Sequence, residues 1–298
     1  SEDGNWHKEY SVIIDTFDLP LRYDFEHYEL NETGKYQVFF EETQGTALFK
    51  QYIWASGNSG FALTGVGRNP QEYPTVSIEN GIDGSRAIKL ETKSTGQFGE
   101  TVKMPIAAGN LFLGSFDVNN AVQKPLKATR FGLPFGKKPL QLKGYYKYTP
   151  GTQPFKAKDK NGNTVTIPGQ EDEGDIYAVL YEAAELDGKA LDGNNVLTSE
   201  NIVALARVEV EKKDEFTAFH VDFHYGSRIP IDWPKFIQDQ RDPSDDGTAP
   251  YLSFSEEKMK NYEYNLAVVF TSSKYGAYFA GSVGSTLCID KVEIVCEK

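Results

Sequence analysis

Two tryptophans lie in segments that we expect to be loops, and the segment around Trp54 is rich in Gly, Ser and Asn. Trp54 lies in QYIWASGNSGFALTG, with Arg68 and Asn69 shortly after it, and Trp233 lies in IDWPKF. Flat aromatic faces and planar polar side chains together recognise a sugar ring, because the ring offers both C–H surfaces and hydroxyl groups. All four residues are therefore candidate ligand contacts. The alternative is that each tryptophan only fills the space beneath its loop.

A short segment, HVDFH, contains His220, Asp222 and His224. Two histidines four residues apart on a helix could chelate a metal ion. Apolar residues alternate with them, however, which is the pattern of a strand. At about 3.3 Å per residue the two histidines then lie roughly 13 Å apart, too far to share one ion. We expect the three polar side chains to share one strand face, where they contact sugar hydroxyls or water.

A basic stretch interrupts this acidic chain. Residues 121–160 carry ten Lys and Arg residues and one acid, whereas the whole chain has a net charge of −12. Within LQLKGYYKY, Lys143, Tyr145 and Lys147 share one strand face, and Leu140 lies with the other apolar residues on the opposite, core-facing side. The polar face suits a sugar ring that carries acidic groups. The alternative is a solvated strand face whose lysines discourage edge pairing.

The C-terminal segment, TLCIDKVEIV, predicts a strand with a bulge. Leu287 and Ile289 follow the alternation of a half-buried strand, which slips across Asp290 and resumes at Val292. Because a slip of one residue turns the following side chains to the other face, a β-bulge next to Asp290 is the simplest explanation.

These candidate residues must be positioned mainly by strands. Runs rich in β-branched and aromatic residues, bounded by Gly, Pro, Asn or Asp, occur at 86–92, 110–116, 140–148, 175–183, 202–210, 216–225 and 264–271. No helix of 10–15 residues separates them, which predicts an all-β antiparallel sandwich. We expect one domain at 20–298, preceded by a linker or first-strand extension at 1–19, with long loops at 55–84, 149–174 and 226–262.

Composition excludes several classes of protein. The acidic charge argues against a nucleic-acid binder, which needs a positive surface. No apolar run approaches the roughly 20 residues of a membrane-spanning helix. The sequence begins SEDGNWHKEY, without the basic and apolar regions of a signal peptide. We therefore expect that any export signal has been removed or never existed.

Neither the cysteines nor the acids identify an enzyme. Cys288 and Cys296 are roughly 26 Å apart along one extended strand, too far for a disulfide. Two cysteines without metal-ligand spacing exclude a cysteine-based zinc site. The chain has 43 acids, so pairs of carboxylates arise by chance, and no catalytic motif is present. We predict no catalytic residue.

Several blocks of sequence resemble a known family. They are AAGNLFLGSF (107–116), FGLPFGKKPLQLKGYYKYTPG (131–151), GDIYAVLYEA (174–183) and SSKYGAYFAGSVGSTLCIDKVEI (272–294). Together they resemble the putative carbohydrate metabolism domain of surface lipoproteins from gut Bacteroidetes. In addition, YDFEHYEL (23–30) and the closing strand resemble the ends of carbohydrate-binding, galactose-binding-like jelly rolls.

The resemblance implies a jelly-roll β-sandwich, export, a lipid anchor at the outer membrane and glycan binding. It also implies a structural calcium, held by Glu26 and Asp290, with Asp24 as a further ligand. Calcium prefers six to eight oxygen ligands, which strand ends can supply. The alternative is that Asp290 caps the bulge and Glu26 is solvated.

We therefore expect an exported, surface-anchored protein that binds a glycan without cleaving it. We expect its partners to include other surface glycan-utilisation proteins. A glycoside hydrolase or lyase on the same scaffold is the second hypothesis. A protein-binding adhesion or structural module is the third.

Overall fold

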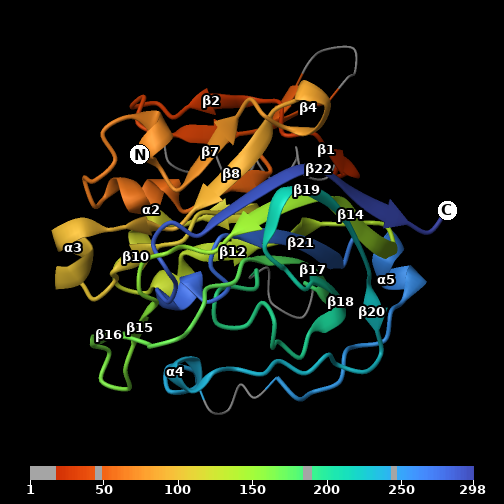
Figure 1. The fold of residues 1–298 in the computed structure, drawn as a ribbon. Helices are drawn as coiled ribbons and strands as arrows, with labels where there is room; N and C mark the ends of the chain where they lie inside the picture. Colours follow the sequence, from red (N-terminus) through yellow and green to blue (C-terminus); the bar gives the residue numbers. More distant parts are fainter. Residues whose placement is uncertain (1–17, 44–48, 184–189, 243–246) are drawn as a thin grey trace, which may run out of the picture.

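The computed structural model describes residues 18–43, 49–183, 190–242 and 247–298, which form two main antiparallel sheets packed face to face (Figure 1). The first sheet has the order β19-β14-β22-β8-β7, with β1 paired to β22. Its strands are β1 (Arg22–Tyr23), β7 (Thr75–Ile78), β8 (Ala87–Glu91), β14 (Pro139–Thr149), β19 (Lys213–Asp222) and β22 (Thr286–Cys296).

The second sheet has the order β12-β11-β21-β17-β18-β20, with β13 paired to β21 and β6 to β11. Its strands are β6 (Trp54–Ala55), β11 (Asn110–Phe116), β12 (Thr129–Phe131), β13 (Leu133–Pro134), β17 (Asp175–Glu182), β18 (Ile202–Val208), β20 (His224–Tyr225) and β21 (Tyr264–Thr271).

The remaining elements are short. Four two-stranded ladders pair β2 (Tyr28–Leu30) with β3 (Gln37–Phe39), β4 (Glu41–Thr43) with β5 (Phe49–Gln51), β9 (Lys93–Ser94) with β10 (Ile106–Ala107), and β15 (Lys156–Lys158) with β16 (Thr164–Thr166). The helices are α2 (Asn58–Ala62), α3 (Gly96–Thr101), α4 (Lys235–Gln238) and α5 (Glu256–Lys260). The prediction of an all-β jelly-roll sandwich is confirmed. The predicted N-terminal linker falls almost wholly outside the described residues.

The main core lies between the two sheets. Leu142 and Ile289 of the first sheet and Ala178 and Val268 of the second are completely buried in it. Side chains alternate along each strand, so one face of each sheet supplies this core. The outer face of the second sheet is also buried, beneath a second apolar cluster that includes Leu191 and Tyr251 from the loops.

Strand β14 shows the predicted alternation with one exception. Lys143, Tyr145 and Lys147 are partly exposed, and the residues between them are buried. Leu140 was expected in the core, but it is 38% exposed. The register of β14 against β22 shifts between Pro139 and Gln141, so Leu140 falls outside the regular alternation.

The predicted bulge beside Asp290 is present. Lys143 and Tyr145, two residues apart on β14, pair with Glu293 and Asp290, three residues apart on β22. Lys291, inside the bulge, has a φ of 46°, in the left-handed region that few non-glycine residues adopt.

The carboxylate of Asp290 is completely buried and holds the turn before β8. Its Oδ2 accepts hydrogen bonds from the Ile82 N–H (2.7 Å) and the Ser85 hydroxyl (2.9 Å). Its Oδ1 accepts from the N–H of Lys291 (2.7 Å). The turn before β8 is thereby tied to the last strand.

The polar row predicted for HVDFH is broken by a change of sheet. His220 and Asp222 lie on β19 of the first sheet, but His224 begins β20, which pairs with β18 in the second sheet. The prediction that all three share one face is wrong for His224. The chain turns a corner of the sandwich between Asp222 and His224.

Replacing Asp290 tests the tie between the last strand and the turn before β8. Asp290→Ala leaves the N–H groups of Ile82 and Lys291 without their acceptor, so we expect a loss of about 2–4 kcal/mol in the free energy of unfolding, measured by urea denaturation. Asp83→Asn is the control, because it removes the charge of a side chain that is 85% exposed in its ion pair with Lys291 and keeps a residue type that tolerates the φ of 57° at this position. Equal stability of the two variants would contradict this role of Asp290.

Candidate functional site

A cavity of about 190 Å³ lies against the outer face of the second sheet. Its floor includes Phe112, Tyr177 and Val269, which lie side by side because Val269 pairs with both of the others. The residues before and after each of the three point into the core between the sheets. The floor therefore faces away from that core.

Separate segments of the chain form the walls of the cavity. They are α2 with the residue before it, the 3₁₀ turn at Pro125–Lys127, residues 193–197 between β17 and β18, the segment around α4, and the loop after β21 with its 3₁₀ turn at Gly276–Tyr278. These segments contribute Gly60, Phe61, Pro125, Val196, Leu197, Trp233, Arg241, Lys274, Ala277 and Tyr278, among others.

Trp233 and Arg241 bring an aromatic ring and a planar cation together in this wall. The Arg241 guanidinium lies 4.3 Å from the centre of the Trp233 ring. It donates to the Tyr278 hydroxyl (2.8 Å) and to the Thr198 hydroxyl (3.2 Å). Stacking and hydrogen bonding thus hold hydrogen-bond donors at the edge of an otherwise largely apolar cavity.

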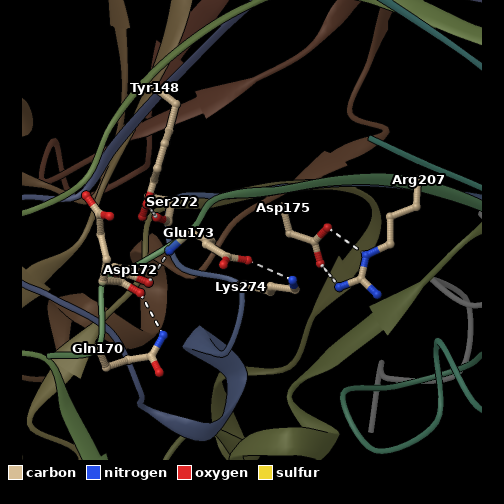
Figure 2. A network of polar contacts seen from close by, with 9 residues as sticks. Tyr148, Gln170, Asp172, Glu173, Asp175, Arg207, Ser272 and Lys274 are labelled. Atoms are coloured by element: carbon tan, nitrogen blue, oxygen red, sulfur yellow. Dashed lines mark hydrogen bonds and ion pairs between the residues drawn. The ribbon is translucent and has the colours of Figure 1, made fainter. Parts of the chain in front are cut away.

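Asp175 lines the cavity at the start of β17 and is 2% exposed. Arg207 on β18 binds it with two hydrogen bonds, from Nε to Oδ1 (2.9 Å) and from Nη2 to Oδ2 (2.7 Å). Burial acts to lower the pKa of Arg207, but the charge and hydrogen bonds of Asp175 outweigh it and raise that pKa. Figure 2 shows this pair beside a second one, Lys274 with Glu173 (2.8 Å).

Asp172 binds the loop that carries Tyr278. Its Oδ2 accepts hydrogen bonds from the hydroxyls of Ser273 (2.6 Å) and Ser285 (2.7 Å) and from the N–H of Ser282 (2.8 Å). Asp172 is 2% exposed, and Figure 2 shows it between Gln170 and Glu173. One carboxylate therefore fixes both ends of the loop between β21 and β22.

The sequence analysis missed Asp172 and Arg241. Both lie in long polar loops, where single charged residues carry no periodic signal. The nearest signal for Asp172 is the group of small hydroxyl residues in SSKYGAYFAGSVGS, since buried hydroxyls need polar partners.

A different surface brings together five of the predicted binding residues. Lys143 pairs with His220 across β14 and β19, and Gln141 beside them donates to Asp222 (2.6 Å). Tyr145 and Lys147 follow on the same face of β14. This outer face of the first sheet lies on the opposite side of the sandwich from the cavity.

The structure places Trp54 in the core, which corrects its expected position in an open loop. It is 4% exposed, and its ring centre lies 5.0 Å from that of Tyr23 and 5.4 Å from that of Phe25. Its indole N–H donates to Glu41 (2.8 Å). Trp54 therefore has no open ring face for a ligand, and its role is to fill the core.

Three other candidates are exposed, two in a turn and His224 on β20. The Asn69 side chain accepts from the Gln71 N–H (3.1 Å) and caps a 3₁₀ turn, and the N–H of Arg68 donates to Glu72 in the same turn (2.7 Å). His224 contacts the Ser227 hydroxyl (3.2 Å). These contacts give each residue a local structural role.

The predicted calcium ligands do not fit a calcium ion. N–H and hydroxyl donors occupy the Asp290 oxygens, the Arg86 N–H donates to Glu26 (3.0 Å), and Asp24 is exposed. A calcium ion would need these carboxylate oxygens as its ligands, but they already accept hydrogen bonds from N–H and hydroxyl groups. In the part of the chain that the structure describes, no group of three or more His, Cys, Asp or Glu side chains could hold a metal.

A melting curve with and without chelator tests the calcium prediction. We expect the same melting temperature in both.

The buried Asp172 predicts a pH dependence of stability. Burial raises its pKa to about 6, from 3.8, although its hydrogen bonds act to lower it. Between these pH values the folded protein holds a proton that the unfolded chain has lost. The Asp172 contribution to stability therefore falls by up to about 3 kcal/mol as pH rises from about 4 to 6, and is constant above that.

Comparison of the wild type with Asp172→Asn isolates this effect. The control is needed because burial also raises the pKa of Glu41, to about 7. Urea denaturation between pH 4 and 8 measures the difference in unfolding free energy between the two proteins. We expect the unfolding free energy of the wild type to rise relative to that of Asp172→Asn as the pH falls. A change in the opposite direction would mean that the hydrogen bonds outweigh burial.

Known proteins resemble this chain over most of its length. A structure described as a putative glycoside hydrolase from Bacteroides thetaiotaomicron is 41% identical with a TM-score of 0.76, and the match covers 95% of this chain and 72% of the other. A second, described in the same way and from Bacteroides vulgatus, is 34% identical with a TM-score of 0.74, over 95% and 100% of the two chains. No curated protein matches the sequence.

The sequence profile of one family matches residues 24–295, nearly all of the described part of the chain. This agrees with the resemblance inferred from the separate sequence blocks. The chain belongs to the putative carbohydrate metabolism domain family.

Proposed function

We propose that this carbohydrate-related domain binds a glycan and that the cavity on the second sheet is the binding site. The observation that carries the proposal is the Trp233–Arg241 pair at the wall of a cavity whose floor is aromatic and aliphatic. Apolar surface suits the C–H faces of a sugar, and the planar guanidinium suits its hydroxyl groups. Trp233 is the candidate from the sequence that lines this cavity.

Binding is favoured over cleavage because of the carboxylates. Among the described residues that line the cavity, Asp175 is the one Asp or Glu, and Arg207 binds both of its oxygens. Glycoside hydrolysis generally uses two carboxylates on opposite sides of the scissile bond. The described cavity offers one, already engaged.

Hydrolysis is the second candidate, because both similar structures are described as putative glycoside hydrolases. Its test is the release of reducing sugar from a bound glycan. Our account expects no release above that of a heat-inactivated sample. Steady release that Asp175→Asn abolishes would establish the hydrolase instead.

We also propose that the protein is exported and anchored by a lipid at the cell surface, on the basis of the sequence resemblance. In the described parts of the chain, no helix has the length and apolar character to cross a membrane. Fractionation of cells that produce the full precursor, with and without its lipid-modified cysteine, tests this proposal.

Glycan binding is tested by a glycan array with variants on the two faces of the sandwich. Trp233→Ala removes the ring that supports Arg241, so we expect a loss of affinity of about tenfold or more. Lys143→Ala and Tyr145→Ala, on the outer face of the first sheet, should bind like the wild type. Circular dichroism checks that each variant is folded.

Loss of binding in the first-sheet variants, with normal binding by Trp233→Ala, would move the site to β14 and β19. Absence of binding to any glycan by the wild type would contradict the proposed function itself.

A further inference from the structure

The charged side chains that line the cavity are already engaged by other groups. Arg207 binds both oxygens of Asp175 (2.9 and 2.7 Å), and Lys274 forms an ion pair with Glu173 (2.8 Å). The Arg241 guanidinium donates to two hydroxyl groups and to a backbone carbonyl group. A ligand that carries its own charge therefore needs a partner outside this set.

Lys158 is a cation beside the cavity without such a partner. Its Nζ lies 4.5 Å from the centre of the Phe279 ring, and Phe279 lines the cavity. Among the described residues, no acceptor lies within hydrogen-bond or ion-pair distance of this amine. Lys158 is nevertheless partly buried, and burial lowers its pKa. An aromatic face attracts a cation, but it replaces only part of the water that burial removes.

Lys103 brings a second positive charge to the same place. It follows α3, and its Nζ donates to Oδ1 of Asn163 (3.1 Å). Asn163 precedes Thr164, which pairs with Lys158 across β15 and β16. The charge of Lys103 also lowers the pKa of Lys158. Like charges close together disfavour their ionised forms, so the fold leaves two cations partly uncompensated here.

The acid of this hairpin does not compensate Lys158. Asp159 accepts hydrogen bonds from the N–H groups of Asn161 and Asn163 (2.8 Å each). Hydrogen bonds and the charge of Lys103 lower the pKa of Asp159, whereas no acid acts to raise the pKa of Lys158. The other described lysines with a shifted pKa each have an acid partner that raises it: Lys50, Lys213, Lys258 and Lys291. Lys158 thus differs from them in lacking an anion.

We propose that Lys158 and Lys103 bind a carboxylate or sulfate group of a glycan that occupies the cavity, so that the ligand is an acidic polysaccharide. Either anion accepts charge-assisted hydrogen bonds from a lysine amine. This inference rests on the proposed function, because it takes a glycan in the cavity as the ligand. It adds the class of that ligand.

A glycan array with neutral, uronic-acid and sulfated glycans tests the class of ligand. We expect the glycans that bind to be acidic. Lys158→Met keeps an apolar side chain over Phe279 and removes the charge, so we expect it to bind them about tenfold or more weakly. Lys147→Met is the matched control, because the Lys147 Nζ lies 5.1 Å from the Phe216 ring centre, on the first sheet. It should bind like the wild type, and circular dichroism checks that both variants are folded.

Removal of the acidic groups identifies the anion. Uronic acids are reduced to neutral sugars and sulfated glycans are desulfated, and each product is compared with its parent. We expect the wild type to bind the product of the recognised kind about tenfold or more weakly, and Lys158→Met to bind that product as the wild type does. Equal binding of parent and product by the wild type, or normal binding of acidic glycans by Lys158→Met, would overturn the anion site and leave glycan binding intact.

Inorganic sulfate tests the anion site without a glycan. Melting temperatures are compared in sodium sulfate and sodium chloride of equal ionic strength, and the general effect of sulfate cancels between variants. We expect sulfate to raise the melting temperature of the wild type and of Lys147→Met by more than that of Lys158→Met. An equal rise in all three would overturn the anion site. If the wild type bound no glycan, the proposed function would fail, and this comparison would still decide whether Lys158 binds an anion.

Discussion

The second sheet must bury both of its faces, and much of the molecule follows from this constraint. All eight residues of β17 are buried, although the first sheet covers only one side of the strand. The other side is covered by loop residues such as Leu191, Ile229 and Tyr251. In Figure 1 the segment that contains α4 runs along the side of the second sheet that faces away from the first. The cavity lies between this outer face and the segments that cover it.

Polar contacts hold these loops in place, because loops lack the hydrogen-bond ladders of strands. Arg228 donates to the carbonyl groups of Leu197 (3.1 Å), Ser199 (2.6 Å) and Ala249, and so joins two covering segments. Asp172 does the same for the loop after β21. A charged group removed from water is costly unless it is hydrogen-bonded, and both the half-buried Arg228 and the buried Asp172 are. The shape of the cavity therefore depends on a few side chains that do not line it.

The sequence predicted the features that repeat along a strand. The alternation in β14 and the bulge beside Asp290 followed from the two-residue period of side chains, which needs no knowledge of distant residues. Leu140 and His224 were misplaced because a bulge and a change of sheet interrupt that period. These interruptions depend on which strands pair, and a single sequence does not contain that information.

The site was harder to predict than the fold. The sequence predicts a loop position for both Trp54 and Trp233, yet Trp54 lies on β6 in the core and Trp233 lines the cavity. What separates them is where each lies in the assembled sandwich, a tertiary property. Asp172 meets its partners Ser273 and Ser285 across more than a hundred residues of sequence. Such contacts become visible only once the two sheets are assembled.

The central claim is that the glycan lies in the cavity over β11, β21 and β17. A crystal structure of the protein with a glycan that binds on the array tests it most directly. Our account predicts density for a sugar in the cavity beside Trp233 and Arg241, with the rest of the chain leaving toward solvent. Density for the sugar over Lys143 and Tyr145 on the first sheet, with the cavity empty, would contradict it.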